Sequence, residues 1–185
     1  VLVAQNLKSQ GFSELNSAAF SQAVNDVMGD GELQVSTEEA QQIVNAFVQQ
    51  AQQAQFQGNI EAGEKFLQEN AQKEGVTTTA SGLQYEVIEA GSGESPQASN
   101  KVKAHYKGYL IDGKVFDSSY ERGEPTTFPV NGVIQGWQEA LQLMKPGAKW
   151  KLYIPHELGY GARGAGQAIP PYSTLIFEIE LIGVE

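Results

Sequence analysis

Proline placement divides this chain into two parts that must fold differently. None of the seven prolines precedes Pro96, and six of them lie beyond residue 120. Because proline breaks the interior of a helix, only the first part is free to form long helices. Turn signals such as Asp112-Gly113 fall in the second part. We therefore expect a helical region over residues 1–75 and a domain of strands and turns over residues 76–185.

Residues 36–74 are expected to form one long stalk helix. Ser36 and Glu39 have the Ser-x-x-Glu spacing of a capping box, and the residues after them are rich in Ala, Gln and Glu, which favour helix. The first half of this segment carries an apolar stripe of Ile43, Val44, Phe47, Val48 and Ala51. The middle, QQAQQAQFQGN, is polar nearly all round, which is typical of a helix that bridges two bodies or packs on a partner. Gly58 and Gly63 are expected to let the stalk bend.

Residues 1–50 are interpreted as a dimerisation module. One face of a predicted helix, ended by Gly29 and Gly31, carries Phe20, Val24, Val27 and Met28. The three short helical elements expected in residues 1–50 provide little hydrophobic core by themselves, so a homodimer is expected. An intramolecular helical bundle is the alternative. Low-complexity disorder is the alternative for the Gln-rich stretch. The segment NDVMGDGEL is interpreted as a turn and not as a calcium loop. Counted from Asp26, positions 3 and 12 of such a loop should carry oxygen ligands of another kind than Met28 and Thr37 provide.

The composition excludes several classes of function. The chain has no cysteine and only two histidines, His105 and His156, so we expect no disulfide, no thiolate catalysis, no metal site and no cofactor. A net charge of −10 opposes binding to nucleic acid or to an anionic membrane. No apolar run has the length of a membrane span, and the first residues do not resemble a signal peptide. A cytoplasmic protein is expected, or a periplasmic one if a leader was removed.

The second part has the alternation of an antiparallel sheet. Three strand faces are expected, formed by Leu83, Tyr85 and Val87, by Trp150, Leu152 and Ile154, and by Leu175, Phe177, Ile179 and Leu181. Between them, Trp137, Leu141 and Met144 fall at i, i+4 and i+7, which places them on one face of a short helix. The predicted fold is α+β, a half-barrel sheet wrapped around that helix.

Trp137 is the aromatic residue that this pattern explains least. Its ring follows a glycine in the first helical turn, where it could be core or the floor of an open pocket. Phe116 directly precedes Asp117, and Tyr160 lies in a glycine-rich loop. One large apolar side chain beside one carboxylate, with few other polar groups, is typical of a small-molecule or peptide pocket.

Three segments, HYKGYLIDGKVFDSS, GVIQGWQEAL and IPPYSTLIFEIEL, resemble the FKBP family of peptidyl-prolyl cis/trans isomerases. The resemblance covers nearly all of residues 82–185, and the helical part is similar in organisation to the dimeric bacterial Mip-like branch. It implies an enzyme that accelerates rotation about Xaa-Pro bonds in unfolded or partly folded proteins. It also implies inhibition by the macrolides that inhibit the FKBP family. It also implies a V-shaped homodimer, joined by its N-terminal helices, with chaperone-like client binding.

The resemblance also assigns roles to individual residues. The catalytic residues would be Asp117, Tyr160, Phe116 and Tyr106. The substrate-binding residues would be Trp137, Val133, Ile134, Phe177, Ile169, Phe128 and Arg122. Trp137 would form the floor, Tyr160 would donate its hydroxyl to a ligand carbonyl, and Asp117 would lie beside the bound amide. The backbone N–H of Ile134 would bind another carbonyl.

Each of these residues also has a plain structural interpretation. Trp137, Phe177 and Val133 could be core, Asp117 a turn residue, Arg122 a solvated charge and Tyr160 a packed loop aromatic. Four residues of the expected rim differ from those of the best-known members: Thr126, Gly132, Ala165 and Ala168. They predict a smaller and less apolar rim, which bears on substrate preference and macrolide affinity. The alternative functions are a proline-recognition or chaperone module with little catalysis, and a dimeric spacer.

Overall fold

The computed structural model describes residues 2, 5, 16–29 and 34–185. It divides into two compact units, one that extends to Gln55 and one that begins at Phe56. The sequence pattern placed the boundary later, at residue 75. The difference arises because the helix after Phe56, α4 (Gln57–Asn70), packs on the sheet of the second unit.

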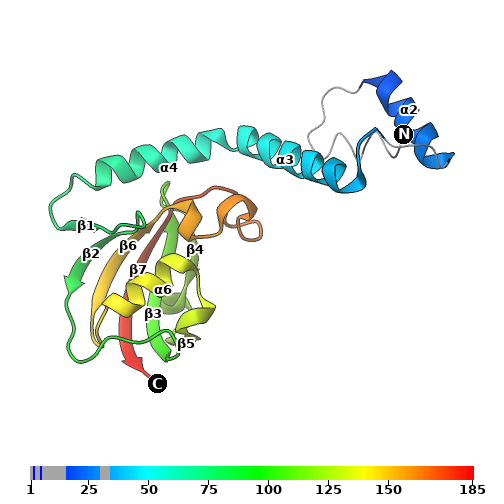
Figure 1. Ribbon diagram of the computed structural model, residues 1–185. Coiled ribbons are helices and arrows are strands. Elements are labelled where there is room, and N and C mark those ends of the chain that lie inside the picture. Colours follow the sequence, from blue (N-terminus) through cyan, green and yellow to red (C-terminus); the bar gives the residue numbers. More distant parts are fainter. Residues whose placement is uncertain (1, 3–4, 6–15, 30–33) are drawn as a thin grey trace. The chain divides into compact units, whose positions relative to one another are not determined.

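The first unit contains α2 (Ser17–Met28) and α3 (Thr37–Gln55), as Figure 1 shows. The predicted capping box is present: the Glu39 N–H donates to Ser36 Oγ at 3.2 Å, and the Ser36 N–H donates to Glu39 Oε2 at 3.1 Å. Helix α2 ends at Gly29. Of the segment NDVMGDGEL, which the sequence pattern assigned to a turn, residues 30–33, including Gly31, lie outside the described part of the chain.

The expected stalk helix over residues 36–74 is interrupted. Phe56 has φ −108° and ψ 16° and therefore leaves the helical conformation between α3 and α4. Nothing lies within 4 Å of the position of a Cβ at Gly58, but a Cβ at Gly63 would collide with the Thr174 hydroxyl. Gly63 therefore allows close packing of α4 on Thr174 within the second unit, which differs from the bending role expected for it.

Seven strands in the described part of the chain form one antiparallel sheet, ordered β1-β2-β6-β7-β3-β4, with β5 paired to β3. Their bounds are β1 Val76–Thr78, β2 Gln84–Glu89, β3 Lys101–Leu110, β4 Val115–Ser118, β5 Thr126–Pro129, β6 Lys149–Ile154 and β7 Leu175–Val184. Short helices connect them: α5 Ser119–Arg122, η1 Val130–Gly132, α6 Gln135–Leu143, η2 His156–Leu158 and η3 Gly161–Arg163. The long strands β3 and β7 pair from Val102 opposite Val184 to Leu110 opposite Leu175.

Helix α6 packs against one face of the sheet, as the predicted half-barrel required (Figure 1). Its Leu141 and the adjacent Met144 are completely buried. Facing them, β6 and β7 contribute the alternating residues expected from the sequence, and Leu152, Ile154 and Ile179 have no exposed surface. The expected burial fails at Val87, which is 45% exposed where the pairing of β2 with β6 becomes irregular.

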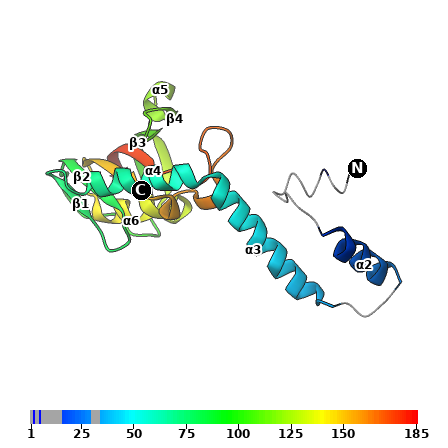
Figure 2. The ribbon, with the colours of Figure 1, turned by 90° about the horizontal axis from the view of Figure 1, so that it is seen from above.

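The opposite face of the sheet is partly covered by α4. Tyr153 alternates with the buried side chains of β6 and so points to this face, yet it is only 6% exposed. The ring of Phe66, from α4, lies with its centroid 6.0 Å from that of Tyr153. Further along the helix, the buried Asn70 donates through Nδ2 to Gln84 Oε1 at 2.9 Å. Helix α4 is therefore an integral part of the second unit, as Figure 2 shows from above.

Candidate active site

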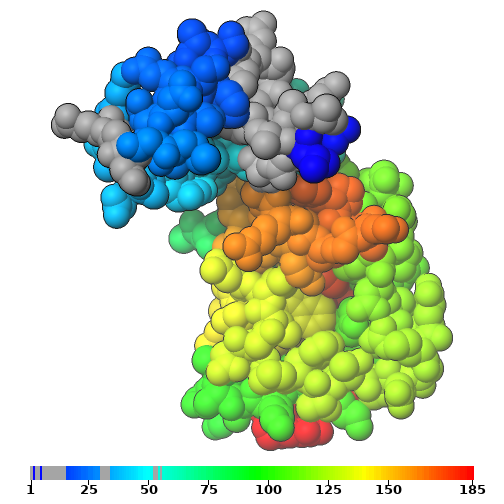
Figure 3. All heavy atoms as spheres, turned by 90° about the vertical axis from the view of Figure 1, so that its right-hand side faces the viewer, coloured from blue at the N-terminus to red at the C-terminus, as the bar shows by residue number. Residues whose placement is uncertain are grey.

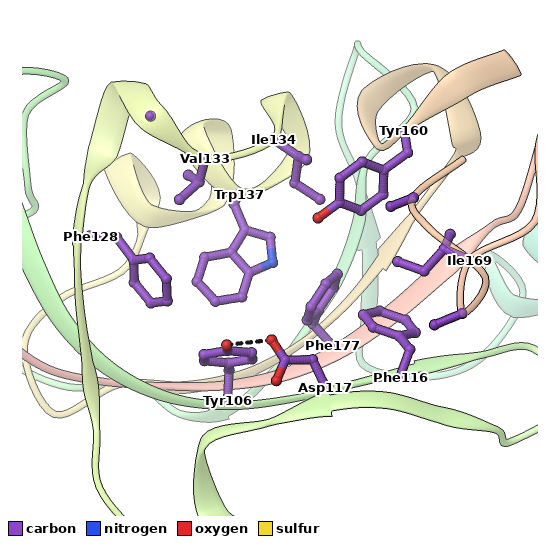
Figure 4. Close-up of a pocket in the computed structure, with 13 residues that line it drawn as sticks. Tyr106, Phe116, Asp117, Phe128, Val133, Ile134, Trp137, Tyr160, Ile169 and Phe177 are labelled. Carbon is purple, nitrogen blue, oxygen red and sulfur yellow. Dashed lines mark hydrogen bonds between the residues drawn. The ribbon is translucent and has the colours of Figure 1, made fainter. Parts of the chain in front are cut away.

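A cavity of about 480 Å³ lies beside α6 and is lined mainly by aromatic and aliphatic side chains. The thirteen lining residues, drawn in Figure 4, are Tyr106, Phe116, Asp117, Phe128, Gly132, Val133, Ile134, Trp137, Tyr160, Ala165, Ala168, Ile169 and Phe177. The lining therefore brings together every residue predicted for the site except Arg122, which hydrogen-bonds to two lining residues, Tyr106 and Asp117. In Figure 3, a hollow is bordered by the orange loop, by the yellow surface near α6 and by the yellow-green surface near β4 and α5.

Trp137 lies at the centre of this lining and is only 4% exposed. Three aromatic rings meet it edge to face, with centroid distances of 5.3 Å to Tyr106, 5.5 Å to Phe128 and 5.2 Å to Phe177. Such T-shaped contacts fix the orientation of the indole beyond what burial alone would do. The two interpretations of Trp137 are thus compatible, because the ring belongs to the core and also forms a wall of the cavity.

The polar part of the site is a network of three side chains. Tyr106, on β3, donates its hydroxyl to Asp117 Oδ2 at 2.6 Å. Arg122, at the end of α5, donates through Nη2 to the Tyr106 hydroxyl at 2.8 Å and through Nη1 to Asp117 Oδ1. The Asp117 side chain keeps 45% of its surface exposed at the mouth of the cavity. Asp117 and Arg122 are therefore held by the site, and neither is merely a turn residue or a free surface charge.

The protonation states follow from these surroundings. Burial alone would raise the pKa of Asp117, but the hydrogen bonds from Tyr106 and Arg122 outweigh it and hold this pKa below its ordinary value. Burial and the hydrogen bond to Asp117 raise the pKa of Tyr106. Burial, aided by the charge of Asp117, also raises the pKa of Tyr160. Near neutral pH, Asp117 is thus a carboxylate and both tyrosines keep their protons.

Ser119 connects this network to the sheet, and the sequence pattern gave it no role. The residue is completely buried. Its Oγ accepts the Tyr106 N–H at 2.8 Å and donates to the Tyr106 carbonyl at 3.2 Å. Because Ser119 begins α5 immediately after β4, this double contact fixes the turn that carries Asp117 and Arg122. Its position directly after Asp117-Ser118 was the only available signal.

Gly108 is a second residue that sequence reasoning missed. A Cβ at this position would lie 2.5 Å from the ring of Phe116 and 2.6 Å from the ring of Phe177. These two rings meet edge to face, with centroids 5.4 Å apart, on the wall of the cavity. A glycine within a strand often marks such a close approach, so HYKGY contained a usable signal.

The segment from Tyr160 to Ile169, here called the rim loop, borders the cavity on its outer side. Within it, the Ala165 N–H donates to the Ile169 carbonyl at 2.8 Å, and the Ile169 N–H donates back at 3.1 Å. Tyr160 is 39% exposed, and its hydroxyl points toward the interior of the cavity in Figure 4. Of the four small residues expected at the rim, Gly132, Ala165 and Ala168 line the cavity. The fourth, Thr126, instead accepts a hydrogen bond from Arg122 Nη2 at 3.2 Å.

The comparisons with known proteins agree with this geometry. Residues 92–182 match the family model of the FKBP-type peptidyl-prolyl cis-trans isomerase, and residues 1–87 match that of the domain amino terminal to it. The chain is 44% identical over 179 residues to the peptidyl-prolyl cis-trans isomerase Mip of Coxiella burnetii, covering 93% of this chain and 78% of that protein. It is 60% identical over 129 residues to the FKBP-type 22 kDa peptidyl-prolyl cis-trans isomerase of Escherichia coli, covering 70% of this chain and 63% of that relative.

A solved structure extends the likeness to the whole chain. The crystal structure of FkpA from Escherichia coli is 41% identical in sequence, with a TM-score of 0.69, and the match covers 100% of this chain and 90% of that one. The likeness thus includes the helical part as well as the strand-rich domain. Aromatic cavity, family matches and structural likeness lead to one conclusion: the chain is a member of the FKBP-type peptidyl-prolyl cis-trans isomerase family.

Proposed function

We propose that this protein accelerates the cis/trans rotation of Xaa-Pro bonds in unfolded or partly folded proteins. The observation that carries this proposal is the cavity itself, an aromatic enclosure around Trp137 with one ionised carboxylate at its mouth. The side chains with shifted pKa values in this cavity, Asp117, Tyr106 and Tyr160, do not titrate near neutral pH, so the site suits a reaction without proton transfer.

The physical chemistry of prolyl rotation matches such a site. Amide resonance gives the bond a rotation barrier of about 18–20 kcal/mol, and no covalent bond has to break. A twisted amide has lost part of its charge separation, so an apolar cavity binds it better, relative to water, than it binds the planar amide. Selective binding of the twisted state accelerates rotation in both directions.

In this proposal each group of the site has a distinct role. The proline ring packs on Trp137, between Phe177 and Phe128. The Tyr160 hydroxyl, which remains protonated, donates to a carbonyl of the bound chain. The Asp117 carboxylate faces the carbonyl carbon of the twisted amide, whose partial positive charge grows when the nitrogen lone pair is no longer shared. Tyr106 and Arg122 hold that carboxylate in place.

The decisive experiment is the cis-to-trans rate of a short Xaa-Pro peptide with and without the protein. We expect an acceleration that a macrolide inhibitor of the FKBP family abolishes. Glu121→Ala is the matched control for Asp117→Ala, because both remove an exposed carboxylate near α5. Macrolide binding without acceleration would favour the alternative function, a proline-binding chaperone module with little catalysis.

We further propose that the first unit joins two chains into a homodimer with chaperone-like client binding. Helices α2 and α3 expose large apolar side chains in the single chain: Val24 44%, Val27 64%, Met28 81%, Ile43 61% and Val44 38%. Apolar faces of this kind are normally covered by a partner. Two cavities in one V-shaped dimer would raise the effective concentration at the second site for a client held at the first.

Sedimentation velocity tests the dimer directly. We expect Ile43→Asp to shift the protein toward a monomer while the rate on a short peptide, which needs one cavity, stays unchanged. Refolding of a proline-limited protein should slow, because the second cavity is lost. Gln42→Asp, an exposed change on the same helix, is the matched control. If Ile43→Asp remains a dimer, the apolar face of α3 is not essential to the dimer interface, and the proposed pairing through this face is refuted.

The compartment is a separate question. Among the described residues, no helix has both the length and the apolar character needed to cross a bilayer. A relative from Legionella longbeachae, 39% identical over 188 residues, is named "Outer membrane protein MIP". That name favours the cell envelope over the cytoplasm, and we propose the periplasmic alternative. Fractionation of cells that express the native gene tests it.

A further inference from the structure

Helix α4 and the residue before it contact the segment that follows the rim loop, Pro170 to Thr174, at three places. The ring of Phe56, directly before α4, lies with its centroid 6.4 Å from that of Tyr172. Asn59 donates through Nδ2 to the Pro171 carbonyl at 3.0 Å. Gly63 approaches Thr174 so closely that any side chain at Gly63 would strike the Thr174 hydroxyl. Asn59 and Gly63, at i and i+4, share one face of α4, and Phe56 lies directly before its first turn.

The same segment forms the base of the rim loop. The Tyr172 N–H donates to the Gly161 carbonyl at 2.8 Å, next to the residue whose hydroxyl points into the cavity, Tyr160. Tyr172 is buried and has a positive φ of 59°, a conformation that a non-glycine residue keeps only when its surroundings impose it. Its ring meets that of His156 edge to face, at 5.2 Å. Tyr172 is thus clamped between the loop and α4.

The rim loop itself has little intrinsic rigidity. Gly161, Gly164 and Gly166 all have positive φ, and glycine loses more conformational freedom on ordering than any other residue. A loop of this composition keeps one shape only if contacts outside it restrict its ends. In Figure 1, α4 runs above the orange segment that contains this loop and its base.

We propose that Asn59 and Gly63 are positioning residues, through which α4 sets the shape of the rim loop. This holds the Tyr160 hydroxyl and the Ile169 side chain at the cavity. The inference rests on the proposed isomerase function and extends it. It makes binding of the substrate depend on a helix that precedes the part of the chain, residues 92–182, that matches the isomerase family model.

The two glycines of α4 provide a matched pair of variants in the full chain. Both Gly58→Ala and Gly63→Ala raise helix propensity by a similar amount. A Cβ at Gly58 meets open space, whereas a Cβ at Gly63 displaces Thr174. For a short Xaa-Pro peptide, we expect Gly63→Ala to lower kcat/KM about tenfold, mainly through KM, because a small misplacement of binding groups is costly. Gly58→Ala should leave both constants unchanged.

Two further variants keep the test independent of how well Gly63→Ala folds. Asn59→Ala removes the hydrogen bond to Pro171 without adding an atom, and we expect it to raise KM about threefold. The double variant Gly63→Ala, Thr174→Ala removes the collision, so KM should return most of the way to the wild-type value. Circular dichroism at the assay temperature establishes that each variant is folded.

The readouts separate positioning from stability and from the proposed function. A purely structural role of α4 would lower the melting temperature but leave KM of the folded variants unchanged, and that result overturns the inference. Affinity for a macrolide inhibitor, followed by tryptophan emission, should weaken in Asn59→Ala and Gly63→Ala in parallel with KM. Unchanged macrolide affinity in both variants would also overturn it. A wild-type protein that does not accelerate peptide rotation refutes the isomerase function instead.

Discussion

Replacing the buried Ser119 by alanine should destabilise the second unit more than replacing its buried neighbour Ser118. The Ser119 hydroxyl has three partners: the N–H of Tyr106 at 2.8 Å, the carbonyl of Tyr106 at 3.2 Å and Nδ1 of His105 at 2.9 Å. A hydroxyl has one proton, so when it donates to the carbonyl, His105 must donate from Nδ1. Alanine would leave the N–H and the carbonyl of Tyr106 without these partners beside a fully buried position.

The expected cost follows from those partners. A lost hydrogen bond contributes about 0.5–1.5 kcal/mol, and a buried polar group left unpaired costs about 1–3 kcal/mol more, which together give roughly 2–4 kcal/mol. The neighbouring Ser118 provides the control. It is also buried, but its hydroxyl only caps α5 by accepting the Glu121 N–H at 3.4 Å, so Ser118→Ala should cost about 1 kcal/mol.

Urea unfolding of both full-length variants, followed by tryptophan emission, measures the difference. Peptide isomerisation provides the second readout, because Ser119→Ala also frees the turn that carries Asp117 and Arg122. Its kcat/KM should fall in protein that is still folded, whereas Ser118→Ala should leave kcat/KM nearly unchanged. Equal losses of stability in the two variants would refute the reasoning, since they would show that the Tyr106 backbone finds other partners.

Four other outcomes follow from the site. Asp117→Asn keeps the shape of the side chain but removes its charge, so kcat/KM on a short peptide should fall about tenfold to a hundredfold while macrolide binding persists. The rate should be nearly constant between about pH 5 and 9, because the pKa of Asp117 is lowered and those of Tyr106 and Tyr160 are raised. The stability that Asp117 contributes is present above its unfolded pKa and is lost as the pH falls through the lower folded value, which acid titration of unfolding measures. Gly108→Ala overpacks the wall formed by Phe116 and Phe177 and should cost about 1–3 kcal/mol in urea unfolding, with weaker macrolide binding.

The elements that could be predicted from the sequence are those with a local period. Leu175, Phe177 and Ile179 alternate because one face of β7 packs on α6, and this burial determines the residue types directly. The capping box at Ser36 was readable for the same reason, since both of its partners lie within one helical turn. The polar network was different: only the family resemblance assigned Tyr106 and Asp117 to one site, because no spacing rule relates a residue on β3 to one on β4.

The features that could not be predicted depend on contacts between distant parts of the chain. The segment around Phe56 has no proline and reads as continuous helix, yet the helix is interrupted where the Phe56 ring packs on Tyr172. Gly63 could be read as a flexible point, but its partner, Thr174, shows that it permits close packing. For the same reason α4, which the sequence pattern assigned to the stalk, belongs to the compact unit that begins at Phe56. A helix that looks like a linker in sequence can be part of a folded unit when its apolar and small residues share one face.

The positions of these distant contacts bear on how the cavity works. Rotation of a prolyl bond needs no proton to be moved, so the polar groups of the site can act only through where they are held. Asp117 is held by Tyr106, Arg122 and, through the turn, Ser119. Within the described part of the chain, no side-chain hydrogen bond holds the Tyr160 hydroxyl, so its position depends on the shape of the rim loop. Amino-acid substitutions in the rim loop should therefore change substrate preference with the least loss of stability. Because α4 contacts the base of this loop, it should limit which loop conformations such substitutions can produce.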